Sequence, residues 1–231
     1  MYKTLKFERA RECLKFLVEK YGIKEIYIPY YLCDVIRHTL FQKSCKPIFY
    51  HINDDFMPEK DFLKDAFILY PNYFGIFGKN VKMLSNIYPN LIVDNAHAYY
   101  QAPSGFACFN SGIKFGYGKN AYLWIKGYKN NFISPITNRE LQNKRLEKFL
   151  ELDKIYSKEN LLNIKKIIST EVNNENFCPF CYPLLAESEE KANHIVNSLQ
   201  YDGYIIYRYW NQLPKSYNEY KFYSRLVPIP V

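Results

Sequence analysis

The 231-residue sequence has no apolar run that approaches the roughly 20 residues needed by a membrane-spanning helix. Its first residues also lack the basic and then apolar pattern of a secretory signal. Hydrophobic residues nevertheless make up 48% of the chain, as in an ordinary globular protein. We therefore expect a cytoplasmic protein without a membrane partner, and the length suffices for one sizeable core or a domain with a small appendage.

A second cysteine pair is also missing, and this bears on metal binding. Among six cysteines, only Cys178 and Cys181 are spaced as Cys-x-x-Cys. A structural zinc site needs about four ligands, which two such pairs usually supply, and His194 is placed on a predicted helix. We therefore predict no metal site and interpret the segment around Cys181 as part of a strand.

The net charge of +8 comes without a dense basic block, because lysines and arginines are scattered along the chain. Such scattering is typical of a solvated basic surface. An anionic substrate or a nucleic acid would also suit the charge, and the 23 tyrosines and 17 phenylalanines could stack on bases. Most of these aromatic residues lie in strand-like runs, where core packing is the usual role, so we expect no nucleic-acid partner.

Helical and strand-like patterns alternate over the first part of the chain. Apolar residues recur at helical spacing over 8–22, and Gly22 follows as a C-cap. Further helices are predicted over 33–44 and 79–88, and strands over 24–32, 46–52, 66–75, 90–100, 106–116 and 120–127. This order predicts an α/β fold, with a three-layer, mainly parallel sheet.

From about residue 137 the pattern changes. Residues 137–169 are charged and helical, and a strand is predicted over 176–187. A helix follows over 188–203, with Ser188 as its N-cap, and then a strand over 204–210. We therefore predict a large α/β domain over 1–136, and a helical linker with a small α+β domain over 137–231.

Two chemically informative segments lie in the predicted large domain. The run LIVDNAHAYY (91–100) places Asp94 at the end of a buried strand, where open parallel sheets bind ligands. Twenty residues later, Lys114 follows Ser111 in a Ser-x-x-Lys pattern. A lysine for a Schiff base and a carboxylate that keeps a pyridine nitrogen protonated are what pyridoxal phosphate requires. Taken singly, a surface lysine and a turn aspartate are the simpler interpretations.

Both segments resemble those of the DegT-type sugar aminotransferases, a family of fold-type-I pyridoxal-phosphate proteins. LIVDNAHAYY is similar to that family's strand ending in Asp-Ala-Ala-His, and FNSGIKFGYGKNAYL (109–123) to its Ser-x-x-Lys segment. Less specific similarities lie in IYIPYYLCDVI, YPNYFGI and DGYIIYRYW. The resemblance extends from about residue 8 to the end of the sequence.

The resemblance implies a role for each matching position. Lys114 would form the Schiff base and move protons, and Asp94 would pair with the pyridine nitrogen. His97 would lie near the ring oxygen of the cofactor or orient Asp94, although a buried histidine bonded to backbone is an equally simple interpretation. Ser111 would contact the phosphate, and Arg11 falls where the family has its phosphate-binding turn at a helix N-terminus.

The sequence departs from the family pattern near that turn. Ala10 stands where the family has glycine, and Glu12 where it has serine or threonine. We expect the Glu12 carboxylate to weaken phosphate binding. The aromatic residue that stacks on the pyridine ring has no clear match, since Cys33 or Tyr31 occupies that region.

The resemblance therefore implies a pyridoxal-phosphate-dependent aminotransferase. Its substrates would be an amino donor and a keto sugar attached to a nucleotide, in surface-polysaccharide or amino-sugar biosynthesis. Members of the family are dimers, so we expect a homodimer. The alternative is a non-catalytic binding or scaffold protein on a degenerate aminotransferase fold.

Overall fold

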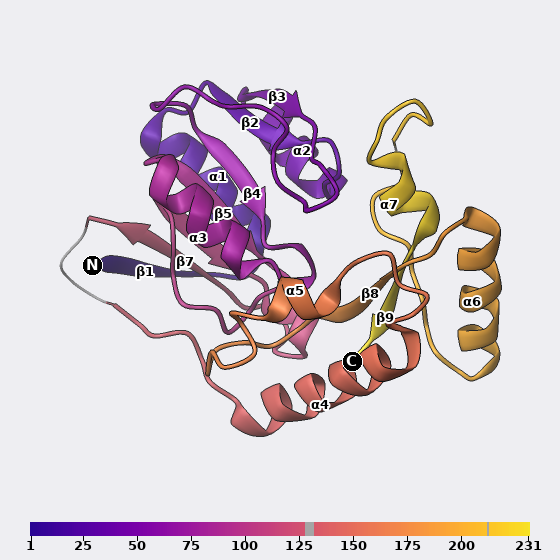
Figure 1. Ribbon diagram of the computed structural model, residues 1–231. Helices are drawn as coiled ribbons and strands as arrows, with labels where there is room; N and C mark the ends of the chain where they lie inside the picture. The colour runs from indigo at the N-terminus through magenta and orange to yellow at the C-terminus, as the bar shows by residue number, and fades with distance from the viewer. Residues whose placement is uncertain (128–131, 212) are drawn as a thin grey trace.

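The structure, a computed structural model, describes residues 1–127, 132–211 and 213–231. Within these ranges the main element is a seven-stranded sheet of order β1-β7-β6-β5-β4-β2-β3 (Figure 1). Strands β3, β2, β4, β5 and β6 run parallel to one another. Strand β7 runs antiparallel to β6, and β1 at the edge runs antiparallel to β7. The strands span Tyr2–Phe7 (β1), Glu25–Pro29 (β2), Lys46–Tyr50 (β3), Ile68–Pro71 (β4), Leu91–Asn95 (β5), Ala107–Asn110 (β6) and Ala121–Lys126 (β7). The predicted mainly parallel α/β sheet is confirmed.

Helices cover both faces of this sheet and produce three layers. Helices α1 and α2 pack on one face, and α3 packs on the other. Short 3₁₀ helices follow β4 and β6. The bounds are Ala10–Tyr21 (α1), Asp34–Gln42 (α2), Tyr73–Gly75 (η1), Gly78–Ile87 (α3) and Gly112–Phe115 (η2).

The alternation of side chains along β5 determines which face Asp94 lies on. Ile92 belongs to the core beneath α1, whereas Leu91 and Val93 belong to the core that includes α3. Successive side chains of a strand point to opposite faces, so Asp94 lies on the same face as Ile92. The carboxylate is therefore directed toward the layer that contains α1.

Hydrogen bonds fix helix α1 at both of its ends. Gly22 adopts the left-handed conformation, with φ 59°, and its amide donates to the last turn of the helix. At the other end, Oε2 of Glu12 accepts hydrogen bonds from the amides of Glu8 and Arg9, each at 3.2 Å. The Glu12 carboxylate is thus used to organise the turn that enters the helix.

The C-terminal part contains helices and a two-stranded antiparallel sheet of β8 and β9. Its elements are Arg139–Tyr156 (α4), Ile164–Ile168 (α5), Cys181–Leu185 (β8), Glu189–Tyr201 (α6), Tyr220–Arg225 (α7) and Leu226–Pro230 (β9). Ser188 caps α6 as predicted, because its side chain accepts a hydrogen bond from the Lys191 amide at 3.1 Å. The division of the chain at residue 136 stays a prediction.

Two strand assignments differ from the sequence prediction. Residues 204–210 form no strand, and the partner of β8 is instead Leu226–Pro230. Pro228 and Pro230 made this segment an unpromising strand, but a two-stranded ladder has free edges where missing amide donors are tolerated. The sequence prediction also missed β1, which pairs antiparallel with β7.

No helix within the described ranges is both long and apolar enough to cross a lipid bilayer.

Candidate functional site

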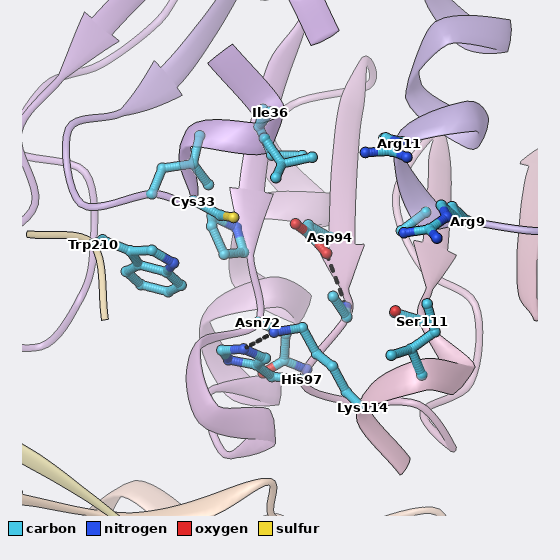
Figure 2. A pocket seen from close by; sticks show the side chains of 16 residues that line it. Arg9, Arg11, Cys33, Ile36, Asn72, Asp94, His97, Ser111, Lys114 and Trp210 are labelled. Carbon is cyan, nitrogen blue, oxygen red and sulfur yellow. Dashed lines mark hydrogen bonds between the residues drawn. The ribbon is translucent and has the colours of Figure 1, made fainter. Parts of the chain in front are cut away.

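A cavity of about 290 Å³ lies at the C-terminal ends of the parallel strands (Figure 2). Asp94 from β5 and the segment after β6 form its floor, and the N-terminal end of α1 lines one side. The loop between β2 and α2, through Cys33, lines another side. All five predicted site residues contribute to this single cavity: Arg11, Asp94, His97, Ser111 and Lys114.

Asp94 presents a buried carboxylate to the cavity. Its side chain is only 9% exposed, and Oδ1 accepts a hydrogen bond from the Ala96 amide at 2.8 Å. The other oxygen, Oδ2, has no hydrogen-bond partner among the described residues. Burial raises the pKa of Asp94 to about 6, although the Ala96 amide and the charge of Lys114 act in the opposite direction. The free oxygen therefore suits a ligand that carries a proton donor.

Lys114 lies on η2, and its amine approaches the same cavity. Nζ is 3.0 Å from Nε2 of His97, so the amine and the imidazole form a hydrogen-bonded pair. Burial lowers the pKa of Lys114, against the opposing effect of the Asp94 carboxylate, and burial also holds the pKa of His97 well below its usual range. These shifts favour a neutral imidazole and make the uncharged, nucleophilic amine more accessible.

The ring of His97 is held between aromatic side chains. Phe180 stacks on it at 4.3 Å with an interplanar angle of 13°, and Trp210 lies parallel to it at 5.9 Å and 7°. Both residues come from the C-terminal part of the chain. The hydrogen bond that fixes Asp94 comes from the Ala96 amide. Among the described residues, the imidazole of His97 forms its hydrogen bond with Lys114 and none with Asp94.

The N-terminal end of α1 is suited to an anion. The amides of Ala10 and Arg11 are at the first helical positions and have no intrahelical acceptor. The side chains of Arg9 and Arg11 flank the cavity, and neither forms an ion pair with a described residue (Figure 2). The hydroxyl of Ser111, a residue that is 9% exposed, likewise lacks a hydrogen-bond partner within the described ranges. Free amides, two cations and a hydroxyl are the usual donors to a phosphate.

The expectation that Glu12 weakens binding of an anion at this site stays a prediction. Glu12 does not line the cavity, because its carboxylate is bound to the amides of Glu8 and Arg9. It occupies the third helical position, where a carboxylate commonly folds back on the start of its helix.

The structure also separates the two candidates for the position of the missing aromatic ring. Cys33 lines the cavity, and Figure 2 shows its sulfur on the side of Asp94. Tyr31 is fully buried elsewhere, where its ring stacks on Tyr73 and its hydroxyl donates to the Phe222 carbonyl. Of these two residues, Cys33 is therefore the one that a ligand in the cavity would meet.

Sequence reasoning missed three polar or aromatic residues of the cavity: Arg9, Asn72 and Trp210. Asn72 follows the end of β4 and could have been found by the same argument as Asp94. Arg9 precedes the first helical residue, so its place depends on where the helix begins. Trp210 comes from a distant segment, and no local pattern indicates it.

Comparison with known proteins identifies the fold. The sequence matches neither a protein-family model nor a curated protein. Solved structures do match, including a putative sugar aminotransferase from Streptococcus pneumoniae, with a TM-score of 0.70, 13% identity, and coverage of 99% of this chain and 81% of that one. The Helicobacter pylori PseC aminotransferase, involved in pseudoaminic acid biosynthesis, gives a TM-score of 0.68 and 16% identity over 98% of this chain and 81% of its own.

A DegT/DnrJ/EryC1/StrS aminotransferase from Brucella abortus gives a TM-score of 0.66 and 11% identity, over 99% of this chain and 80% of its own. The Streptococcus protein has been solved in apo, pyridoxal-phosphate and pyridoxamine-phosphate forms. These structures share the architecture described above at low sequence identity. The chain therefore has the fold of the DegT/DnrJ/EryC1/StrS-type aminotransferases, as its sequence motifs indicated.

Proposed function

We propose that the protein is a pyridoxal-phosphate-dependent aminotransferase that acts on a nucleotide-linked keto sugar. One observation supports this most strongly: a single cavity joins the free oxygen of Asp94, the amine of Lys114 and the anion-binding end of α1. Three separate parts of the sequence supply these groups. They correspond to the three attachments that the cofactor requires, namely its ring nitrogen, its aldehyde carbon and its phosphate.

The cavity residues fit the cofactor chemically. Asp94 would hold a proton on the ring nitrogen, because its buried carboxylate has one oxygen that accepts no hydrogen bond from a described residue. The amides of Ala10 and Arg11, with the Ser111 hydroxyl, would hold the phosphate. When bound, pyridoxal phosphate supplies an electron sink that stabilises a carbanion at the carbon bearing the amino group.

The remaining residues would manage protons and exclude water. Lys114 would carry the proton between the two carbons that exchange the amino group, since its amine lies in the cavity and has a lowered pKa. His97, held neutral by burial, would accept a hydrogen bond from the amine and orient it. The aromatic rings that sandwich His97 would keep bulk water from this pair.

The substrate and assembly belong to the same proposal. Arg9, Arg11 and the net charge of +8 favour anionic ligands, as a nucleotide diphosphate is. A product of this kind would enter surface-polysaccharide or amino-sugar biosynthesis. We also propose a homodimer, as the sequence resemblance implies.

A non-catalytic protein on the same fold is the alternative. The departures from the family pattern at Ala10 and Glu12 motivate it, although the Glu12 carboxylate binds the amides at the entry to α1. The structure offers this alternative no specific observation of its own.

A spectrum of the purified protein tests the proposal. Added pyridoxal phosphate should produce a visible absorbance band that borohydride bleaches and that Lys114→Ala lacks. Glutamate and a nucleotide-linked keto sugar should then yield the aminated sugar by mass spectrometry. A protein that stays colourless with excess cofactor would overturn the enzyme proposal and leave the non-catalytic alternative.

A further inference from the structure

Trp210 reaches the cavity from outside the large sheet. It lies after α6, in a segment that forms neither helix nor strand. Its backbone has φ 58°, in the left-handed region that a bulky residue rarely adopts. Such strain persists only where surrounding contacts hold it, and strained residues concentrate at functional sites.

Aromatic contacts fix the indole on several sides. Tyr31 meets it edge to face at 4.4 Å, and Tyr73 does so at 5.7 Å. His97 lies parallel to it. These contacts account for a fixed ring position, because aromatic pairs of this geometry are favourable beyond the area they bury. Packing alone, however, does not require a tryptophan. A phenylalanine could make such ring contacts without an N–H group, which needs a hydrogen-bond partner when it is buried.

The indole N–H of Trp210 has no partner among the described residues. Figure 2 shows the ring nitrogen on the edge that faces the cavity. The other tryptophan, Trp124, is different: its ring is buried and its N–H donates to the Ile133 carbonyl at 2.8 Å. The Trp210 donor is thus available to a ligand in the cavity.

The cavity has two chemically different ends. Arg9, Arg11 and Ser111 lie at one end, and Trp210 lies at the other, with Asp94 and Lys114 between them (Figure 2). The cationic end fits the cofactor phosphate. A substrate must meet the reacting atoms beside the Lys114 amine, so the end toward Trp210 is the one left for it.

We propose that Trp210 forms the wall of the substrate subsite and contacts the sugar ring of the acceptor. Its N–H donates to a sugar oxygen, and the apolar edge of the indole packs against ring C–H groups. A pyranose presents both kinds of surface, and tryptophan is the side chain that combines a large apolar body with a single donor. This inference rests on the proposed function and deepens it, because it assigns recognition of the sugar to a named residue.

Fluorescence tests the contact without reference to turnover. The chain has two tryptophans, so Trp124→Phe leaves Trp210 as the only indole. In the presence of pyridoxal phosphate, this variant is titrated with UDP-glucose, a stable hydroxy analogue of a keto sugar nucleotide, and separately with UDP. UDP-glucose should change the Trp210 emission saturably and more strongly than UDP. Equal changes with both, or calorimetric binding of UDP-glucose without any change, would overturn the proposal.

Affinity measurements separate the ring from its donor. Trp210→Ala should weaken UDP-glucose binding on the order of tenfold, as expected for the loss of packing and a hydrogen bond. Trp210→Phe keeps an aromatic ring and should lose only the share of the UDP-glucose affinity that the N–H hydrogen bond contributes. It also provides the comparison if the alanine variant does not fold. Unchanged affinity in Trp210→Phe and in a folded Trp210→Ala would show that Trp210 only packs against His97.

The outcomes distinguish this inference from the proposed function. If wild-type protein forms no cofactor band, the proposed function fails. If the band forms and glutamate bleaches it normally, but the Trp210 variants bind UDP-glucose as wild type does, only this inference fails. Absence of UDP-glucose binding at millimolar concentration in an otherwise active protein would likewise overturn it.

Discussion

Nζ of Lys114 lies 3.0 Å from Nε2 of His97, and the imidazole of that pair lies parallel to the rings of Phe180 and Trp210. Lys114 and His97 both follow strands of the large sheet, whereas Phe180 and Trp210 come from the C-terminal part of the chain. The protonation state of the Lys114 amine therefore depends on its burial, on the Asp94 carboxylate and on the packing of the C-terminal part against the large sheet region.

The reactivity of the Lys114 amine should follow from its surroundings. Burial lowers its pKa, and the Asp94 carboxylate opposes this by stabilising the ammonium. Asp94→Asn removes the opposing charge, so the pKa of Lys114 should fall further. Reductive methylation of the apo protein across pH, followed by peptide mapping, should show Lys114 labelled at lower pH in the variant. Lys119, which does not line the cavity, serves as an internal control, and a Lys114 profile shifted to higher pH would contradict the assignment.

Asp94 should reduce the stability of the apo protein while it supports activity. Its folded pKa, about 6, lies above the ordinary value of 3.8, so between these values the folded state binds more protons than the unfolded state. The stability contributed by Asp94 therefore falls as pH rises from about 4 to 6, and the cost is fully present at pH 7. Asp94→Asn should stabilise the apo protein at pH 7 by about 3 kcal/mol and should have little effect at pH 3.5.

The same substitution should lower any aminotransferase activity by roughly 10²-fold, since an amide cannot keep the ring nitrogen protonated.

Urea unfolding of wild type and Asp94→Asn at pH 7 and pH 3.5, with Ser111→Ala as a control for the site, measures the stability difference. A variant less stable than wild type at pH 7 would show that the carboxylate is satisfied within the apo fold.

Local pattern was enough to predict the elements that bear the chemistry, but it did not predict how they come together. Asp94 could be identified because a buried apolar run ends in a carboxylate, and Ser188 because it precedes a helix with acidic residues in its first turn. β9 and Trp210 could not be found in this way. The first contains two prolines and depends on pairing with β8, and the second owes its position to packing against distant rings.

Glu12 should support cofactor binding instead of opposing it. Its carboxylate holds the amides of Glu8 and Arg9, which precede the first turn of α1. Glu12→Ala should cost about 1 kcal/mol of unfolding free energy and weaken pyridoxal phosphate binding, because the anion site loses its organisation. Glu12→Gln keeps an acceptor oxygen, so its unfolding free energy and its affinity for the cofactor should lie between those of wild type and Glu12→Ala. Calorimetric titration and urea unfolding measure both effects, and tighter cofactor binding by Glu12→Ala would restore the idea of direct repulsion.

The two arginines at the start of α1 should recognise the phosphate and not the ring. Neither side chain is engaged in an ion pair within the described ranges, and both flank the cavity. Arg9→Met and Arg11→Met keep much of the side-chain length but lose the charge. Each should weaken pyridoxal phosphate several-fold and leave pyridoxal, which has no phosphate, nearly unchanged. Equal losses for both compounds would indicate that the substitutions disturb the cavity as a whole.

Gly75 should be essential to the fold because the chain beside His97 passes very close to it. Gly75 has φ 74°, and an added Cβ would lie 2.2 Å from the His97 carbonyl oxygen and 3.0 Å from that of Cys178. Both obstacles are backbone atoms, so they cannot rotate away. Gly75→Ala should therefore reduce the free energy of unfolding by more than about 3 kcal/mol, through collision added to backbone strain.

Gly203 provides the matched control for this substitution. It also has a positive φ, 87°, but nothing lies within 4 Å of its added Cβ. Gly203→Ala should therefore cost only the strain of a left-handed alanine, about 1–2 kcal/mol. The difference between the two variants in urea unfolding isolates the close approach of Gly75 to the His97 backbone. If the two alanine variants were equally destabilised, the segment carrying His97 would have to be able to move away from η1, and the fixed position of the imidazole beside Lys114 would lose its support.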